Sequence, residues 1–576
     1  MQPYVIVPSQ GSDQEDEWVR LGVEAHVNNK LAEAQKHYQQ ALRLNPRNAI
    51  ATQNLAIVFA QSNLLNEALL TIERATLFDT THGVMLINRA FMCLEADRID
   101  EAITSAERAV ALYPLNGHVM TETEKHGYIK SRLSLAMVLA TAGRPAESLQ
   151  YYQEMLAQDP AEPVASPNSC FVQTLTTATP ADLLASRKAW YVANGYKGEK
   201  KPHTNDRTLT RPLRVGYVGG DFKTHSASMI FGQVVRHHRP EHVIPYLYSS
   251  LPLDKATDVR SKLFHDVAQD RFRDITTMQS EDVDKLIRQD QIDILVDLAG
   301  HTNGGRLLVF TRKPAPIQIS AWGFAHGTGI PEMDYFLADP VAVPLDERQY
   351  FTETIVDVPC IVSYDAPTEY GLKGTSILPY YTNDHITFGC SARYEKLSES
   401  CLQTFAEILR LVPDSTLQFK DHAFRRPYSI KRVYAAMPDI APERLLFSIS
   451  SSHQDHMLAY QQADLCLDPF PHGGGVVALE QLYMGVPLLT YYGSQPSGRT
   501  AASVLTAMNR TEWIAKSREE YRDKAVALTQ DVKALAAARK TLRKEFLESP
   551  VVAGYPEAIE AAYRTMWEKW CTKSNP

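Results

Sequence analysis

The stretch PFPHGGGVVALE, residues 469–480, follows a short apolar run and leads into helix-like sequence. Its three consecutive glycines, Gly473 to Gly475, allow backbone N–H groups to approach a ligand, and the N-terminus of the helix behind them attracts anions. A second stretch, GYVGGDFKTH at residues 216–225, has the same order of apolar run, glycines and helix. Two such turns, one in each of two α/β units, predict a two-lobed enzyme with a phosphorylated ligand in its cleft.

Around these turns, short apolar runs alternate with helical stretches, which is typical of parallel, doubly wound sheets. We therefore expect one Rossmann-like lobe at residues 208–375 and a second, with terminal helices, at residues 376–576. The expected strands are 213–218, 243–248, 292–298, 317–322 and 335–338, then 386–390, 417–420, 445–448, 465–467 and 488–491. The expected helices are 227–238, 281–289, 304–310, 398–411, 452–461, 476–484 and 498–507, and two more, 531–546 and 556–570, are expected to pack back across the first lobe.

The first third of the chain repeats with a period of 34 residues from Glu15. Small residues recur where two helices of one repeat must pack closely, and a proline ends the second helix, which is the tetratricopeptide pattern. The signature residues of four copies are Gly22, Ala34, Tyr38, Ala41 and Pro46; Ala56, Ala68, Ile72 and Ala75; Ala90, Ala102, Ala106, Ala109 and Pro114; and Ala136, Ser148, Tyr152, Met155 and Pro160. We expect a disordered tail at residues 1–14 and the repeats, with a linking helix near 180–194, at residues 15–200. Such arrays bind proteins, so a protein partner is expected.

Composition excludes several other classes of protein. The net charge of −8 argues against a nucleic-acid binder, and no apolar run is long enough to span a membrane. The seven cysteines are scattered without Cys-x-x-Cys spacing, so we expect reduced thiols in a cytoplasmic protein. The chain lacks a P-loop, a dinucleotide fingerprint and a His/Cys cluster with metal spacing, so we expect no metal and no other cofactor.

Polar residues just behind the expected strands are the candidates for chemistry, because ligands of parallel sheets lie at the carboxyl ends of the strands. In the first lobe these are Asp221, His225 and His301. A histidine there can act as a base or donate to phosphate. For His225 alone, the alternative role of a cap on its own helix is favoured and stays open.

In the second lobe, Lys396 follows the first strand and can neutralise a diphosphate, unless it is an ordinary surface lysine. His453 and His456 stand where the ring edge of a base or a ribose would lie. Glu480, in the helix behind the glycines, can accept two hydrogen bonds from a ribose diol, unless it is exposed to solvent.

Several longer motifs carry a resemblance to a known family. They include LRVGYVGGDFKTH, RKPAPIQISAWGFAHGTG, EMDYFLADP and the run from QADLCLDPFPHGGG through GVPLLTYYGSQPSGRTAASVL. From about residue 15 to 570 the chain resembles the protein O-linked N-acetylglucosamine (O-GlcNAc) transferase family, and most of all its short bacterial members. The resemblance implies a GT-B fold and an inverting, metal-independent transfer of N-acetylglucosamine from UDP-GlcNAc. The acceptors it implies are Ser or Thr hydroxyls of intracellular proteins that the repeat array presents.

The resemblance also implies site residues. His225 matches a proposed catalytic base, and Lys396 matches the lysine that holds the diphosphate, with Asp221 and His301 beside them as further catalytic candidates. The residues matched to nucleotide-sugar binding are Arg393, Lys396, His453, His456, Gly474, Gly475, Val476, Val477, Glu480 and Arg499. The chain departs from the animal enzymes by carrying Gly475-Val476-Val477 in place of HTT, His453 in place of a lysine and Arg393 in place of a glutamine.

These departures leave two alternatives open. The same fold could use another donor, such as GDP-fucose or UDP-glucose. The chain could also be a tetratricopeptide adaptor that binds a nucleotide and has little activity.

Overall fold

The computed structural model describes residues 14–78, 83–115, 120–252, 258–372, 377–450 and 452–572. The chain divides into two compact units, residues 1–165 with 425–432 and residues 166–424 with 433–576. Except for Gln14, the predicted disordered tail lies outside the described residues. The domain boundaries expected from the sequence stay predictions. Among the described residues, no helix is both long enough and apolar enough to cross a bilayer.

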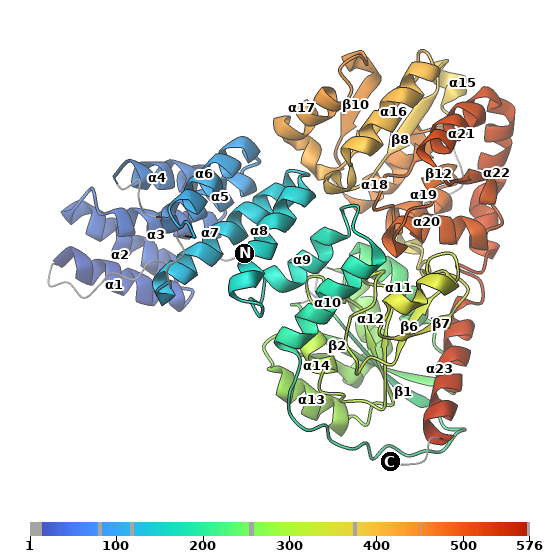
Figure 1. The fold of residues 1–576 in the computed structure, drawn as a ribbon, viewed down its shortest axis with the longest axis horizontal. Helices are drawn as coiled ribbons and strands as arrows, with labels where there is room; N and C mark the ends of the chain where they lie inside the picture. Colours follow the sequence, from blue (N-terminus) through green and yellow to red (C-terminus); the bar gives the residue numbers. More distant parts are fainter. Residues whose placement is uncertain are drawn as a thin grey trace. The chain divides into compact units, whose positions relative to one another are not determined.

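The first unit contains four antiparallel helix pairs, which confirm the predicted repeats (Figure 1). The pairs are α1 (Gln14–Val27) with α2 (Leu31–Leu44), α3 (Ala49–Gln61) with α4 (Leu65–Phe78), α5 (Gly83–Glu95) with α6 (Ile99–Ala111), and α7 (Glu122–Thr141) with α8 (Pro145–Gln158). The small residues allow close packing: a Cβ on Gly22 would lie 2.5 Å from Tyr38. In the fourth pair, Ser148 Oγ donates to Ala136 O at 2.6 Å, so the two signature positions touch.

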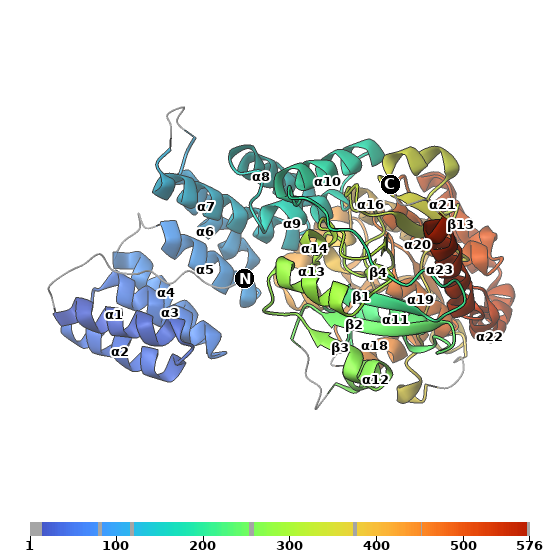
Figure 2. The ribbon, with the colours of Figure 1, turned by 90° about the horizontal axis from the view of Figure 1, so that it is seen from below.

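The second unit begins with α9 (Ala165–Gln173) and α10 (Pro180–Asn194), followed by a seven-stranded parallel sheet. Its strand order is β3-β2-β1-β4-β5-β6-β7. The strands are β1 (Leu213–Gly219), β2 (Val243–Ser249), β3 (Phe272–Asp274), β4 (Ile294–Asp297), β5 (Ile317–Ser320), β6 (Tyr335–Ala338) and β7 (Thr354–Asp357). The crossover helices are α11 (Ser226–Arg236), α12 (Val259–Ala268), α13 (Ser280–Gln289) and the short α14 (Leu307–Phe310), and Figure 2 shows β1 to β3 beside α11 and α12. We call this part the N-terminal lobe.

A second parallel sheet of six strands, in the order β10-β9-β8-β11-β12-β13, forms the C-terminal lobe. Its strands are β8 (Thr387–Cys390), β9 (Thr416–Lys420), β10 (Leu445–Ser448), β11 (Leu465–Leu467), β12 (Leu488–Tyr491) and β13 (Ile514–Ala515). Its helices are α15 (Tyr380–Asn383), α16 (Glu399–Leu411), α18 (His453–Ala459), α19 (Val476–Tyr483), α20 (Pro496–Ala507) and α21 (Arg518–Gln530). A further helix, α17 (Pro427–Ala436), follows β9 in the chain, but its residues 427–432 belong to the first unit. In each sheet the order of the strands reverses beside the first strand, between β1 and β4 and between β8 and β11. The predicted pair of doubly wound units is confirmed.

The strands that the sequence pattern missed, β3, β7 and β13, are all edge strands. An edge strand is covered by fewer neighbours, so it needs no continuous apolar run: Thr354 and Asp357, at the ends of β7, are exposed. The pattern also missed α9, α12, α15, α17 and α21. It made the helix at 304–310 too long, because Gly304 has a φ of +82° and α14 begins only at Leu307.

The last two helices, α22 (Val532–Glu548) and α23 (Tyr555–Thr572), pack on different lobes. α22 lies against α19 of the C-terminal lobe, whereas α23 returns to α11 and β5 of the N-terminal lobe (Figure 1). Trp567 on α23 is fully buried. One continuous apolar cluster runs through both lobes. The expected return across the first lobe is therefore correct for the final helix, and α22 stays with the C-terminal lobe.

Glu560 anchors α23 to the N-terminal lobe. Its carboxylate lies 3.2 Å from His238 Nδ1 and accepts hydrogen bonds from the backbone N–H and Nε of Arg239, both at 2.8 Å. Burial would raise the pKa of Glu560, but the bonds from His238 and Arg239 outweigh it and lower the pKa to about 2. A carboxyl whose pKa is depressed in this way stabilises the fold above its unfolded pKa and loses that effect as the pH falls.

We expect Glu560→Gln to lower the free energy of unfolding at pH 7 by about 2 kcal/mol, because it removes the charge to which the buried His238 ring and the two Arg239 N–H groups are bonded. The loss should shrink as the pH falls from 4.5 towards 2. Urea unfolding at several pH values measures both effects. Glu557→Gln, an exposed residue of the same helix, is the matched control, and equal losses in the two variants would contradict the anchoring role.

Candidate functional site

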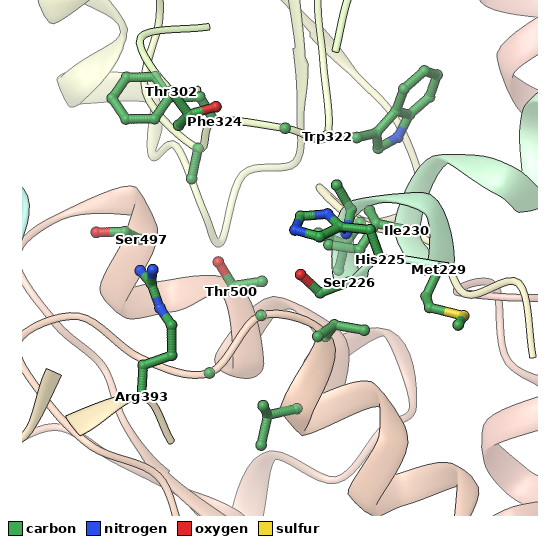
Figure 3. Close-up of a pocket in the computed structure, with 18 of the residues that line it drawn as sticks. His225, Ser226, Met229, Ile230, Thr302, Trp322, Phe324, Arg393, Ser497 and Thr500 are labelled. Carbon is green, nitrogen blue, oxygen red and sulfur yellow. The ribbon is translucent and has the colours of Figure 1, made fainter. Parts of the chain in front are cut away.

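A cavity of about 780 Å³ opens between the two lobes of the second unit. Its walls include the loops that follow β1 and β4 on one side and β8 and β11 on the other, which are the strands flanking the two switch points. In open parallel sheets this is where the crevice for a ligand forms. Figure 3 shows His225 of the N-terminal lobe and Arg393 of the C-terminal lobe entering this space from opposite sides.

The structure brings together every site residue predicted from the sequence except Arg499. The residues that line the cavity are Asp221, His225, His301, Arg393, Lys396, His453, His456, Gly474, Gly475, Val476, Val477 and Glu480. They come from loops more than 250 residues apart in the chain, as His225 and Glu480 show.

The loop of residues 472–475, which we call the glycine loop, leads directly into α19. Gly475 is the residue before the helix, and a Cβ built on it would meet nothing within 4 Å, so it faces open space. Among the described residues, none accepts a hydrogen bond from the N–H groups of Gly475, Val476 or Val477. The unpaired N–H groups and the helix dipole make this end of α19 attractive to an anion.

Two cations stand beside the glycine loop. Lys396 is half-buried, and its Nζ donates to Gly473 O at 2.7 Å. Burial and the charge of Arg393 lower the pKa of Lys396 to about 8. Arg393 is exposed and pairs with Glu395 at 3.2 Å. The alternative of an ordinary surface lysine therefore does not describe Lys396, which points from the end of β8 into the cavity wall.

His225 faces the cavity and also caps its own helix. Its Nδ1 accepts a hydrogen bond from the Ala227 N–H at 3.2 Å, and it lies 3.4 Å from Asp221 Oδ1. The side chain remains 46 % exposed. The capping role expected as an alternative is present, and it leaves Nε2 as the nitrogen that a ligand can reach.

His301 lines the cavity but is held by the fold. Its Nε2 donates to Thr328 O at 2.8 Å, and its ring packs edge-on against Trp190 at 5.1 Å. Burial lowers the pKa of His301 to about 4. His326 and His472 are also uncharged, because burial holds the pKa of each well below its ordinary value. The positive charge of this wall therefore comes from Arg393 and Lys396 rather than from the histidines.

Glu480 is buried, so the alternative of an exposed glutamate does not hold. Its carboxylate accepts hydrogen bonds from His453 Nε2 at 2.7 Å and from the Tyr460 hydroxyl at 2.8 Å. Burial would raise the pKa of Glu480, but its bonds to His453 and His456 outweigh burial and lower the pKa to about 2. Tyr370, near the end of the N-terminal lobe, reaches His453 Nδ1 at 3.0 Å. The result is a fixed, negatively charged pocket next to α18.

Arg499 lies outside the cavity lining, with its donors used elsewhere. It makes a two-pronged ion pair with Glu347 at 2.8 and 2.6 Å and donates to Gly493 O at 2.7 Å. The pair joins α20 of the C-terminal lobe to the N-terminal lobe. The structure thus places Arg499 as a tie between lobes, and its charge does not face the ligand space.

The sequence analysis missed the wall contributed by α9. Phe171 and Asn168 line the cavity, and the Arg393 guanidinium lies 5.4 Å from the centre of the Phe171 ring. Thr174, just after α9, lies 3.2 Å from His472 Nδ1. No local motif marks α9 as part of the site, because its role depends on contacts with residues some 220–300 positions away. His472, in contrast, stood inside the quoted glycine stretch and could have been found there.

Comparisons with known proteins agree with this architecture. A sequence profile described as Glycosyl transferase family 41 matches residues 191–362 and 375–555, and a tetratricopeptide repeat profile matches residues 20–80. The structure of an O-GlcNAc transferase from Thermobaculum terrenum superposes with a TM-score of 0.76 at 23% identity, covering 97% of this chain and 99% of that one. The predicted order of tetratricopeptide repeats followed by a GT-B fold is confirmed.

The chain is also similar to curated plant proteins. Two are named probable UDP-N-acetylglucosamine–peptide N-acetylglucosaminyltransferase SPINDLY: one from Hordeum vulgare is 33% identical over 381 residues, and one from Arabidopsis thaliana is 34% identical over 376 residues. The Hordeum match covers 65% of this chain and 40% of the relative, and the Arabidopsis match covers 64% and 40%. The chain thus matches about two fifths of the length of these relatives.

The neighbouring glycines of the glycine loop have different surroundings, which allows a matched test. A Cβ on Gly474 would lie 2.7 Å from Asp468 Oδ1, whereas a Cβ on Gly475 meets nothing within 4 Å. We expect Gly474→Ala to destabilise the protein by about 1–3 kcal/mol through overpacking. Gly475→Ala should change stability by less than about 1 kcal/mol. Thermal unfolding of the two variants measures the difference. Equal melting temperatures would contradict the claim that Gly474 is crowded and Gly475 is not.

Proposed function

Because this chain belongs to glycosyl transferase family 41, we propose that it is a protein glycosyltransferase that moves N-acetylglucosamine from UDP-GlcNAc to Ser and Thr hydroxyls. The proposal includes inversion at the anomeric carbon and a reaction without a metal. Acceptor proteins would be presented by the tetratricopeptide array. The observation that carries the proposal is the cavity in which Lys396 and the N-terminus of α19 face His225.

The leaving group of such a transfer is a nucleoside diphosphate, whose developing charge must be stabilised. Lys396, Arg393 and the free N–H groups of residues 475–477 supply positive charge and donors at one end of the cavity. Donors that are already in place when charge develops lower the barrier without reorganisation. These groups support a transfer in which the protein itself stabilises the diphosphate.

The nucleoside end of the donor fits next to Glu480. Each carboxylate oxygen has two lone pairs, so Glu480 can keep its bonds from His453 and Tyr460 and still accept from a ribose diol. Since Tyr460 donates to Glu480, its oxygen accepts from His456 Nε2, which lies 2.7 Å away. The rings of His453 and His456, with their centres 6.1 Å apart, also line the cavity, where the base would lie.

The geometry of His225 bears on whether it is the base. Because Nδ1 accepts the Ala227 N–H, the neutral ring carries its proton on Nε2. Nε2 then donates a hydrogen bond and cannot take a proton, unless Nδ1–H turns to Asp221 instead. We therefore assign His225 the role of a hydrogen-bond donor that orients the sugar or the acceptor. The C–O bond to the diphosphate breaks as the new bond to the acceptor oxygen forms, and the proton of the acceptor hydroxyl passes to the departing diphosphate.

Calorimetric titration with UDP, GDP and their sugars tests the donor, and mass spectrometry of candidate acceptor proteins tests the transfer. UDP should bind more tightly than GDP, and UDP-GlcNAc should leave a GlcNAc group on Ser or Thr. Tighter binding of GDP or GDP-fucose, or transfer from UDP-glucose, would show that UDP-GlcNAc is not the donor substrate. If the protein bound the nucleotide but modified no acceptor, the alternative of a tetratricopeptide adaptor with little activity would be favoured.

The partners and location of the protein are part of the same proposal. The four repeat pairs support a protein acceptor, since such arrays bind extended peptides. The cysteine thiols are all free, which supports a place in the reducing cytoplasm.

Two substitutions separate the proposed roles. Lys396→Ala should lower kcat by about 10²–10³, the loss typical of one donor to a transition state. His225→Gln should retain more transfer than His225→Ala, because its amide can donate as Nε2–H does but cannot accept a proton. Steady-state kinetics with a modified acceptor measure both. His237→Ala, at the other end of α11, is the control and should transfer at the wild-type rate. If Lys396→Ala transferred the sugar at the wild-type rate, Lys396 would not stabilise the leaving group. If both His225 variants lost activity equally, His225 would be the catalytic base.

A further inference from the structure

Asp468, directly behind β11, is a buried carboxylate that the proposed chemistry has not used. It is 4% exposed, and both of its oxygens are bonded. Oδ1 accepts the Gly474 N–H at 2.7 Å, and Oδ2 accepts the Thr490 hydroxyl at 2.7 Å. Its backbone is held as well, because the Tyr521 hydroxyl donates to Asp468 O at 3.0 Å. The carboxylate therefore has one fixed orientation under the glycine loop.

The hydrogen bond from Gly474 and the hydrogen bond from Lys396 belong to the same peptide unit. The C=O of Gly473 accepts Lys396 Nζ at 2.7 Å, and the N–H of the next residue, Gly474, donates to Asp468 at 2.7 Å. In a trans peptide these two groups point in opposite directions. The peptide is thus polarised between a carboxylate and an ammonium group, and each hydrogen bond strengthens the other.

We propose that Asp468 is a positioning residue for the transfer, and that it acts on Lys396 through the peptide between Gly473 and Gly474. This inference rests on the proposed function, in which Lys396 faces the diphosphate. By turning the Gly474 N–H inwards, Asp468 leaves the N–H groups from Gly475 onward for the phosphates. By fixing Gly473 O, it fixes the place of Nζ at the edge of the cavity.

The same carboxylate explains the first two residues of the glycine triplet. A Cβ on Gly473 would lie 2.9 Å from Oδ2, and a Cβ on Gly474 would lie 2.7 Å from Oδ1. Only glycine lets the loop lie this close to a buried carboxylate. The third glycine, Gly475, has open space around it, so its freedom serves the ligand and not the contact with Asp468.

The charge of Asp468 also acts on Lys396. The charged or titratable groups around the ammonium are Arg393 and Glu395 on its own turn, His472 on the glycine loop and Asp468 behind β11. Burial and Arg393 lower the pKa of Lys396, whereas Asp468 and Glu395 raise it. Removing the charge of Asp468 therefore lowers the pKa of Lys396 further, and Lys396 loses its proton at a lower pH.

Asp468→Asn tests this inference because it keeps the size of the side chain and an oxygen for the Gly474 N–H. The first readout is the rate at which an amine-acylating reagent labels Lys396, followed against pH by mass spectrometry of the unliganded full chain. The half-labelling pH should fall by about one unit, as expected when an opposite charge is removed. The second readout is UDP affinity, and the pH above which this affinity is lost should fall by the same amount. In steady-state kinetics, kcat should be reduced by a larger factor than KM is raised.

Asp464→Asn is the matched control. Asp464 lies just before β11, is also buried, and accepts the N–H groups of Tyr380 and Thr387, both at 2.8 Å. It should lose stability without moving the labelling curve of Lys396. Thr490→Ala supplies a second test if Asp468→Asn does not fold. The hydrogen bond from Thr490 lowers the pKa of Asp468, so its loss should move the curve in the same direction by a smaller amount.

A labelling curve that stays at its wild-type position in Asp468→Asn and Thr490→Ala would overturn the inference. An equal shift in Asp464→Asn would do the same, because the effect would then be unspecific. Labelling needs no ligand, so it is independent of the proposed function. If wild-type protein bound no UDP at any pH, the proposed function would fail while the labelling result still decided the role of Asp468.

Discussion

The site depends on a constraint of parallel sheets: neighbouring strands are joined by crossover helices, so all strands end at one edge. Both sheets of the second unit are parallel throughout. In each sheet the chain first adds strands on one side of its first strand and then on the other side. The loops behind β1 and β4 therefore open towards those behind β8 and β11. His225, Lys396 and the glycine loop owe their meeting to this geometry, because nothing in their local sequence brings them together.

The electrostatics of the cavity follow from burial. Histidines that are taken out of water lose their charge, and His301, His326 and His472 are all in this position. Lys396 stays charged at neutral pH because its pKa is about 8 and a carboxylate lies beyond the peptide that it contacts.

The two lobes are joined by contacts of two helices, α23 and α20. The helix α23 crosses back to the N-terminal lobe and is anchored there by Glu560. Arg499 of α20 pairs with Glu347, and Ser503 of the same helix donates to Asp339. The buried arginine expected at the ligand is therefore one of the links that hold the lobes together. Motif matching could not distinguish these roles, because a buried arginine satisfies either one.

The sequence by itself determined the repeats and the two doubly wound sheets, and the resemblance of its motifs to a known family marked most of the residues that meet in the cavity. Local patterns carry this information: a 34-residue period, apolar strands and glycines before a helix. The edge strands β3, β7 and β13 escaped because they lack an apolar run. Only the tertiary structure decided that α9 forms part of the wall, that Arg499 links the lobes and that Asp468 holds the glycine loop. Each of these depends on contacts made across space, and a hydrogen bond or ion pair of that kind leaves no periodic trace in the chain.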